Sequence, residues 1–179
     1  KMFTDAITAW DIKTAHDFDT AMIGRNALNS QATRSLGVEV ALLQDKKVIH
    51  LLWDMQKFFD SVKVCAMIDR LQELGYPPYL LILGVQAHKA PRILKAGESF
   101  SELVLKPGRS ILAGCQQSVS WTRGLMHRLV TALGNILPRA PCYQHVDDLS
   151  QAMAHKSSRV VIDAGVEAGK LVGREVSDF

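Results

Sequence analysis

An apolar run that stops at an aspartate constrains this chain more than any other feature of its sequence. Residues 48–53 read Val-Ile-His-Leu-Leu-Trp, and Asp54 follows them directly. A run of this length is typical of a strand that is buried on both faces. Because side chains alternate along a strand, Asp54 shares a face with His50 and Leu52, while Trp53 points the other way, toward covering helices. We therefore expect a buried strand that presents one carboxylate to a cleft.

Two more aspartates lie in a predicted hairpin. Segments 142–146 and 149–154 flank Asp147 and Asp148 and read as two strands with an acidic turn between them. Aspartate is common in turns and at strand ends, so either feature alone would be ordinary structure. Carboxylates that converge without Lys or Arg partners repel one another, and divalent cations held by oxygen ligands relieve that repulsion. Two such ions, about 3.5 to 4 Å apart, stabilise the oxygens of a phosphoryl displacement. The combination favours phosphoryl or nucleotidyl transfer.

Helical periodicity describes much of the remaining chain. After Asp60, apolar residues fall on one helical face, and we expect Asp60 to be the N-cap of this helix and Gly75 its C-terminal stop. The pattern also predicts helices over 17–45, 79–87, 115–136 and from Ser157 or Ser158 to about Val172, with a strand over 99–105.

Composition narrows the class of protein. The 179 residues suffice for one domain, or for one domain and part of a second. With 47% hydrophobic and 22% charged residues, the composition is that of a folded chain and excludes disordered, collagen-like and coiled-coil proteins. No apolar run is long enough to span a membrane, and no signal peptide is visible. The net charge of +3 is compatible with a polyanionic partner but is too small for a dedicated nucleic-acid binder.

The cysteines indicate the compartment. Cys65, Cys115 and Cys142 are odd in number and widely spaced, which disfavours a structural zinc site and a disulfide framework. A reducing environment, as in the nucleus or the cytoplasm, fits them better, and the sequence leaves the localisation itself open.

Three segments, in this order and spacing, resemble the palm motifs of reverse transcriptases, most closely those of non-LTR retrotransposons, group II introns and retrons. Residues 54–62 match the first motif: an aspartate after a strand, three residues, two aromatics and an aspartate before a helix. Residues 145–149 match the third, an aromatic, any residue and Asp-Asp, although His145 replaces the usual Tyr or Phe. Residues 114–121 depart from the second. The family usually shows Gln-Gly and Ser-Pro there, whereas this chain has Cys115-Gln116 and Ser120-Trp121.

The resemblance spans about residues 48 to 154 by motif and implies a fold. The expected class is α+β: a polymerase palm, built as an antiparallel sheet with helices packed on one face, plus part of the fingers. Residues 1–47 would form partial, mainly helical fingers, and residues 48–179 would form the palm with its catalytic motifs. The thumb would be absent, so we expect this chain to be incomplete for activity alone. The remaining fingers and the thumb would belong to the full-length protein.

The resemblance also assigns roles to residues. Asp54, Asp147 and Asp148 would be catalytic and would hold two Mg²⁺ ions, for which Mn²⁺ could substitute. The Phe59 ring would lie under the sugar of the incoming nucleotide, where its bulk excludes a 2′-hydroxyl and so favours DNA synthesis. Phe58 is expected simply to pack. Nucleotide binding would also involve Met55 and Gln116, and nucleic-acid binding would involve Arg109, Ser120 and Lys106. Arg123 and Arg128, which flank the second motif, would either contact template phosphates or only solvate a surface.

The function implied is RNA-directed DNA polymerisation by a retroelement enzyme. An RNA template, a DNA primer and deoxynucleoside triphosphates would be its partners, and no membrane would be involved. Two alternatives stay open. An RNA-directed RNA polymerase is one, although Phe59 argues against it. The other is a catalytically degenerate, palm-derived module that binds nucleic acid or serves as a scaffold, which the altered second motif and the missing thumb favour.

Overall fold

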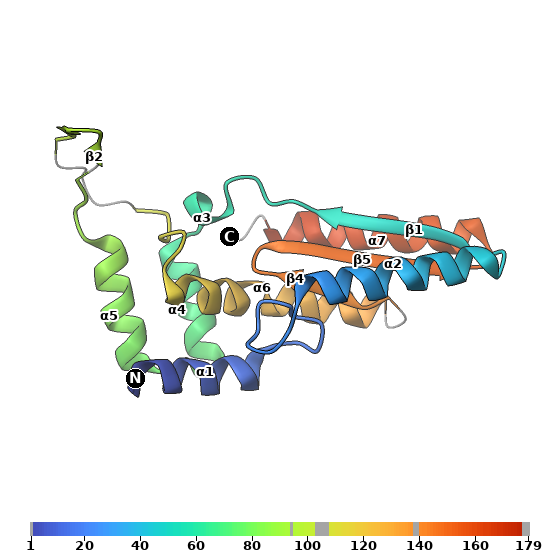
Figure 1. Cartoon of the computed structure of the whole chain (residues 1–179), viewed down its shortest axis with the longest axis horizontal. Helices are drawn as coiled ribbons and strands as arrows, with labels where there is room; N and C mark the ends of the chain where they lie inside the picture. The colour runs from blue at the N-terminus through green and yellow to red at the C-terminus, as the bar shows by residue number, and fades with distance from the viewer. Residues whose placement is uncertain (1, 94, 103–107, 138–139, 177–179) are drawn as a thin grey trace.

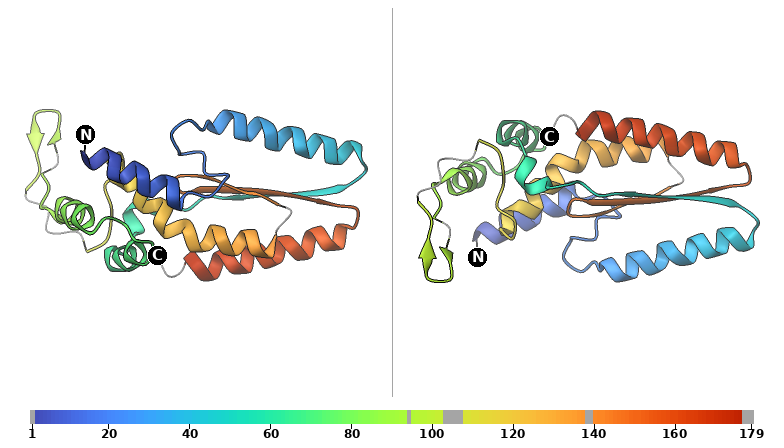
Figure 2. Two further views of the ribbon diagram at one scale, coloured as in Figure 1. Left: turned by 90° about the horizontal axis from the view of Figure 1, so that it is seen from below. Right: turned by 90° about the horizontal axis from the view of Figure 1, so that it is seen from above.

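A three-stranded antiparallel sheet lies between two layers of helices. The computed structural model describes residues 2–93, 95–102, 108–137 and 140–176. The strands run in the order β1-β5-β4. One face of the sheet is covered by α6 and α7, and α2 lies over the other face (Figures 1 and 2). The bounds of these elements are α2 Ala27–Leu43, β1 Lys47–Trp53, α6 Gln116–Ile136, β4 Cys142–His145, β5 Asp148–His155 and α7 Ser158–Val176.

The other elements gather toward the end of the sheet at which β1 ends (Figure 1). They are α1 Met2–Thr14, α3 Phe58–Ser61, α4 Val64–Glu73, α5 Pro78–Lys89, and a small hairpin of β2 Lys95–Ala96 and β3 Ser99–Phe100. Seven helices and two antiparallel sheets in the described part of the chain confirm the α+β class. No helix among the described residues is both long and apolar enough to cross a membrane.

The two faces of β1 differ as alternation predicts. Trp53 and Leu51 are partly buried and pack against the main core, beside α7. A Cβ atom added to Gly165 of α7 would meet Ile49 Cδ1 at 2.5 Å, which shows how closely this helix approaches the strand. On the other face Leu52 is 68% exposed. The prediction that β1 is buried on both faces is therefore wrong, because an open cavity, lined by Leu52 and by residues of α2, lies between this face and α2.

The helices at 79–87 and 115–136 and the last helix are confirmed as α5, α6 and α7. Helix α2 begins only at Ala27, because the Asn26 side chain caps it by accepting a hydrogen bond from Leu28 N at 2.8 Å. Of the strand expected over 99–105, the structure has Ser99–Phe100, and residues 103–107 lie outside the described ranges.

Asp60 is not the N-cap of α4. It lies within the short helix α3, and the N-cap of α4 is Lys63, whose side chain makes no capping bond. Between the two helices the backbone is held extended, because Ser110 N donates to Val62 O at 3.0 Å and Lys63 bridges to Arg109. This pairing with a distant segment interrupts the helix that the local sequence predicts.

Gly75 stops α4 as predicted. Its φ is 69°, its N–H donates to Gln72 O at 3.0 Å, and Tyr76 N donates to Leu71 O at 2.8 Å. This pair of bonds is the Schellman arrangement, in which the residue after the cap adopts a left-handed conformation.

We predict that Gly75→Ala lowers the free energy of unfolding by about 1 kcal/mol, because a Cβ atom is disfavoured at positive φ. Gly173→Ala is the matched control. Gly173 is exposed within α7, and an added Cβ there meets nothing within 4 Å. Alanine is the better helix former, so this change should be neutral or stabilising. Urea unfolding of both variants checks the prediction, and equal effects at the two positions would contradict it.

Candidate functional site

The sheet brings three aspartates to one of its ends. Trp53, the last residue of β1, pairs with Leu149 of β5, so the register carries Asp54 toward Asp148. His145 pairs with Asp148, and the two residues between them form the hairpin turn, of which Asp147 is the second. Aspartates that are distant in the sequence thus share one site.

Electrostatic repulsion links the three carboxylates. Burial raises the pKa of Asp147, and the negative charges of Asp148 and Asp54 raise it further. Among the described residues, no Lys or Arg forms an ion pair with any of the three. None of the three carboxylates is therefore neutralised by an ion pair with a described Lys or Arg.

The hairpin turn is strained and is held by a buried glutamine. Val146 has a φ of 57°, which is unfavourable for a β-branched residue. Gln144 is buried, and its Nε2 donates to Val146 O at 2.8 Å. Thr20 fixes this strand from the other side, since its N and Oγ1 both donate to Gln144 O, at 2.8 and 3.0 Å. Gln144 and Thr20 thus position the turn that carries Asp147.

A cavity of about 460 Å³ lies between α2 and the sheet beside the carboxylates. We call it the α2–sheet pocket. Asp54 lines it together with His50 and Leu52, the strand face that alternation assigns to a cleft. Asp148 lines it as well, whereas Asp147 does not. Its other lining residues are Thr20, Ala27, Ser30, Gln31, Arg34, Trp53, Tyr143, Gln144, His145, Leu149 and Ser150.

The carboxylates suit a hard cation that is bound together with a substrate. No group of three or more His, Cys, Asp or Glu side chains in the described part of the chain is arranged to hold a metal ion alone. Mg²⁺, however, is usually bound by one or two carboxylates, waters and substrate phosphates, not by a complete protein cage. A set of carboxylate oxygens without ion-pair partners among the described residues, such as Asp54 with Asp147 and Asp148, fits that mode.

The two aromatic residues after β1, Phe58 and Phe59, differ in burial. Phe58 is 3% exposed and belongs to the core, as predicted. Phe59 is partly buried and meets Phe58 edge-on, with ring centroids 5.6 Å apart. Ile111 N donates to Phe59 O at 2.9 Å, which fixes the backbone at this position.

The remaining predicted site residues are dispersed. Met55 and Arg109 line a separate cavity of about 370 Å³. Gln116 is exposed at the start of α6, and neither cavity includes it. Ser120 is buried, and its hydroxyl donates to Asp11 Oδ2 at 2.9 Å. Lys106 lies outside the described residues.

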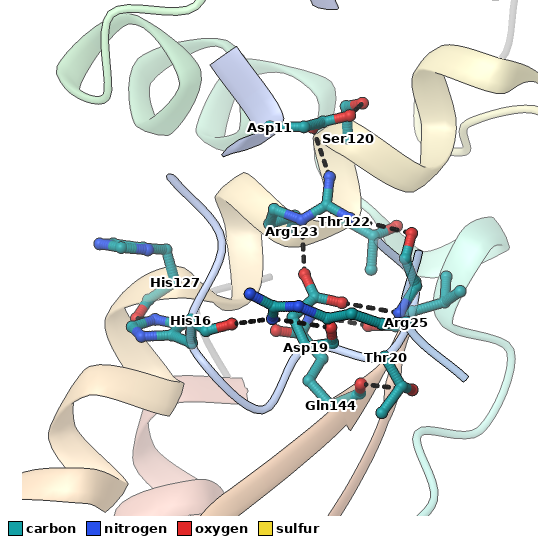
Figure 3. A network of polar contacts seen from close by, with 12 residues as sticks. Asp11, His16, Asp19, Thr20, Arg25, Ser120, Thr122, Arg123, His127 and Gln144 are labelled. Atoms are coloured by element: carbon teal, nitrogen blue, oxygen red, sulfur yellow. Dashed lines mark hydrogen bonds and ion pairs between the residues drawn. The ribbon is translucent and has the colours of Figure 1, made fainter. Parts of the chain in front are cut away.

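Arg123 does not contact template phosphates, because it is buried in an ion-pair network (Figure 3). Its Nε donates to Asp19 Oδ2 at 2.5 Å, and its Nη1 pairs with Asp11 Oδ1. Burial raises the pKa of Asp11 although the Arg123 charge opposes that shift. The network ties α1 and the segment before α2 to α6. Arg128, by contrast, is exposed and pairs with Glu175 at 3.1 Å.

Sequence reasoning missed Gln144, Thr20 and the partners of Arg123. The available signal for Gln144 was its position, two residues after a buried cysteine on an alternating strand, where an inward polar side chain must find a partner. Nothing local indicated that residues 18–20 would lie beside β4.

No protein-family model matches this chain, and a search of curated proteins found none with significant similarity.

Removing the charge of Asp147 should stabilise the metal-free protein. Its pKa is raised in the folded state, so the ionised form costs stability at every pH above that raised value. We predict that Asp147→Asn increases the free energy of unfolding near neutral pH, and that the gain vanishes below the ordinary pKa of 3.8. Urea unfolding of the variant and the wild type, near neutral pH and below pH 3.8, measures this gain. Exposed Asp17 provides the control variant Asp17→Asn. Added Mg²⁺ should stabilise the wild type and so reduce the difference in the free energy of unfolding between Asp147→Asn and the wild type. If Asp147→Asn is instead less stable than the wild type near neutral pH, the carboxylates do not repel one another as described.

Proposed function

We propose that this chain is the palm, with part of the fingers, of an RNA-directed DNA polymerase of a retroelement. The observation that carries the proposal is the grouping of Asp54, Asp147 and Asp148, none of which forms an ion pair with a described Lys or Arg, at one end of an antiparallel sheet beside a pocket. The motif resemblance around Asp54 and Asp147 supports it independently.

The proposed reaction is attack of a primer 3′-hydroxyl on the α-phosphate of a deoxynucleotide, with loss of pyrophosphate. Asp54 and Asp147 would hold the Mg²⁺ ions, with Asp148 adding negative charge. Bound Mg²⁺ supplies stabilisation of the attacking and leaving oxygens. The protein contributes position: β1 and β5 fix the distance between the aspartates, and Gln144 holds the turn.

The test is deoxynucleotide incorporation on a primed RNA template, with and without Mg²⁺, by protein that contains this chain. Template-dependent, metal-dependent extension is expected. Extension that needs no divalent cation, or no extension by a protein that still binds the primed template, would contradict the proposal.

A non-catalytic, palm-derived module is the second candidate. The burial of Ser120 and Arg123 favours it, because two polar residues of the second-motif region serve the fold and are unavailable to a substrate. This candidate predicts that Asp54→Asn leaves nucleic-acid binding and biological activity unchanged, whereas a polymerase loses its activity.

A substitution of Phe59 tests whether its ring excludes ribonucleotides in favour of deoxynucleotides. We predict that Phe59→Val raises ribonucleotide incorporation relative to deoxynucleotide incorporation by at least about tenfold, or ~1.4 kcal/mol of discrimination, because a smaller side chain leaves room for the 2′-hydroxyl. Competition between the two triphosphates in primer extension measures this ratio. Phe100→Ala, at an exposed aromatic of β3, is the control. Unchanged discrimination by Phe59→Val would favour an RNA polymerase.

A further inference from the structure

Two histidines lie face to face where the chain that follows α1 meets α6. The rings of His16 and His127 are nearly parallel, at an angle of 20°, and their centroids are 4.6 Å apart (Figure 3). His16 Nε2 also lies 3.3 Å from His127 O and 3.5 Å from Thr131 Oγ1. Both residues are partly buried, and neither lines the α2–sheet pocket. The proposed reaction therefore leaves this pair without a role.

The stacked contact disfavours protonation of both rings. Two positive charges would then face each other across 4.6 Å. The Nδ1 atom of His127 is buried and makes no hydrogen bond with a described residue. A protonated imidazole carries an N–H on both nitrogens, and a buried N–H without an acceptor costs free energy. Among the described residues, no carboxylate forms an ion pair with either ring.

The pKa of His127 is shifted in the direction that these costs require. Burial lowers this pKa, the charge of His16 lowers it further, and the backbone of Thr14 opposes part of the shift. A histidine whose pKa is lowered by folding binds protons more readily in the open or unfolded chain. Its contribution to stability is fully present above the ordinary pKa of 6.5 and is lost as the pH falls toward the lowered value. Mild acid should therefore weaken the contact.

The charged groups around the pair do not offset a charge on His127. Arg70 and Glu73 of α4 line a cavity of about 390 Å³ together with His127, but they pair with each other at 2.9 Å. Arg128 of α6 pairs with Glu175 of α7 at 3.1 Å. The charged residues on the side of His16 are the exposed Lys13 and Asp17, together with Asp19, Arg25 and Arg123. The carboxylate that shares the cavity is thus already engaged.

Residues 15–18 connect the histidine contact to β4. Asp19 N donates to His16 O at 3.1 Å, and Arg25 Nη1 donates to the same carbonyl at 2.6 Å. Two residues after His16, the carbonyl of Phe18 accepts a hydrogen bond from Gln144 N at 3.1 Å. Gln144 also holds the hairpin turn through its side chain. Movement of His16 away from α6 would therefore disturb the pairing of this stretch with the strand that leads into the turn.

We propose that His16 and His127 form a pH-sensitive latch, which holds residues 15–18 against α6 near neutral pH and releases them in mild acid. The opening is local, because the buried ion pair between Asp19 and Arg123 holds the chain directly after this stretch. The latch does not rest on the proposed polymerase function. It can be tested on the chain alone, without metal or template, so its failure and that of the polymerase proposal are distinguishable.

A titration of the wild-type chain, with a chelator present, is the first measurement. The ¹H–¹³C signals of both imidazoles report their protonation, and hydrogen-exchange protection factors are measured for two reporter amides, Asp19 N and Gln144 N. From about pH 7.5 to about pH 5 we expect this protection to fall at least about threefold, because the open form takes up protons more readily. The amide of Met67, which is buried in α4, should keep its protection.

Substitutions show whether the pair is the cause. In His127→Gln the ring that titrates is gone, so protection of the reporter amides should not change over this pH range. In His16→Gln the His127 signal should titrate at a higher pH than in the wild type, because the opposing charge is removed. His155→Asn is the matched control at an exposed histidine, whose Nδ1 accepts from Ser157 N, a bond that asparagine can keep. It should behave as the wild type does.

Three results would overturn the latch. His145 is a second histidine near the reporter amides, since its Nδ1 lies 3.0 Å from Thr20 Oγ1. If His127→Gln keeps the pH dependence of the wild type, His145 or another group is the cause. Constant protection of the reporter amides while His127 titrates in the wild type would be equally decisive, and it needs no variant. Loss of protection at Met67 over the same pH range would indicate unfolding of the whole chain in place of a local opening.

Discussion

Asp54→Asn and Asp147→Asn are each expected to lower metal-dependent deoxynucleotide incorporation at least about a hundredfold, equal to ~2.7 kcal/mol of lost transition-state stabilisation. Each change removes one anionic ligand while keeping the shape of the side chain. The two aspartates come from β1 and from the hairpin turn, so each variant tests a separate half of the site. Primer extension on an RNA template in Mg²⁺ measures the loss.

The matched control is Asp17→Asn, a change of equal charge at an exposed position outside the three strands of the sheet. It should extend primers as the wild type does. Mn²⁺ affinity of the chain itself, measured by electron paramagnetic resonance, gives a second readout that needs no thumb or template. Both site variants should bind Mn²⁺ more weakly than Asp17→Asn does. Normal extension or normal Mn²⁺ affinity in either site variant would remove that aspartate from the site.

Arg123→Met is expected to lower the free energy of unfolding by about 3–5 kcal/mol, the usual result when one partner of a buried ion pair is removed. Arg123 is 2% exposed and Asp19 is 1% exposed, so the loss of the guanidinium leaves a buried carboxylate without a counter-charge. Asp11, the second partner, comes from α1, so the change also removes one of the polar contacts between that helix and α6, while the bond from Ser120 to Asp11 remains. Chemical denaturation of the purified variant measures the loss.

Two comparisons show whether charge is the cause. Arg128→Met alters the same helix at an exposed ion pair and should cost no more than about 1 kcal/mol. Adding Asp19→Asn to Arg123→Met should recover part of the lost stability, because the uncompensated charge is then removed. If the double variant is as unstable as Arg123→Met alone, lost packing explains the effect and the electrostatic account is wrong.

Local patterns in the sequence predicted the elements whose boundaries depend on nearby residues. The strand before Asp54, the acidic hairpin and the stop of α4 at Gly75 were all predicted, because alternation, turn chemistry and positive φ act over a few residues. The proximity of Asp54 to Asp147 was expected as well, because one aspartate ends a predicted strand and the other lies in the turn of a predicted hairpin. In the structure the charge of Asp54 raises the pKa of Asp147.

Features that depend on distant contacts were not predicted. The interruption after Asp60 comes from pairing with Ser110 and Arg109, and the burial of Arg123 depends on Asp19, more than a hundred residues earlier in the chain. The position of α2 over the sheet, which creates the α2–sheet pocket, depends on the packing of distant segments, and no local sequence pattern predicts it (Figure 2).

A crystal structure of the chain with Mn²⁺ soaked in, located by anomalous scattering, tests the central claim most directly. We predict at least one Mn²⁺ ligated by carboxylate oxygens of both Asp54 and Asp147, at distances of about 2.0–2.3 Å. Carboxylates that lie far apart, that pair with arginines, or that share no ion while Mn²⁺ binds elsewhere would contradict a polymerase palm.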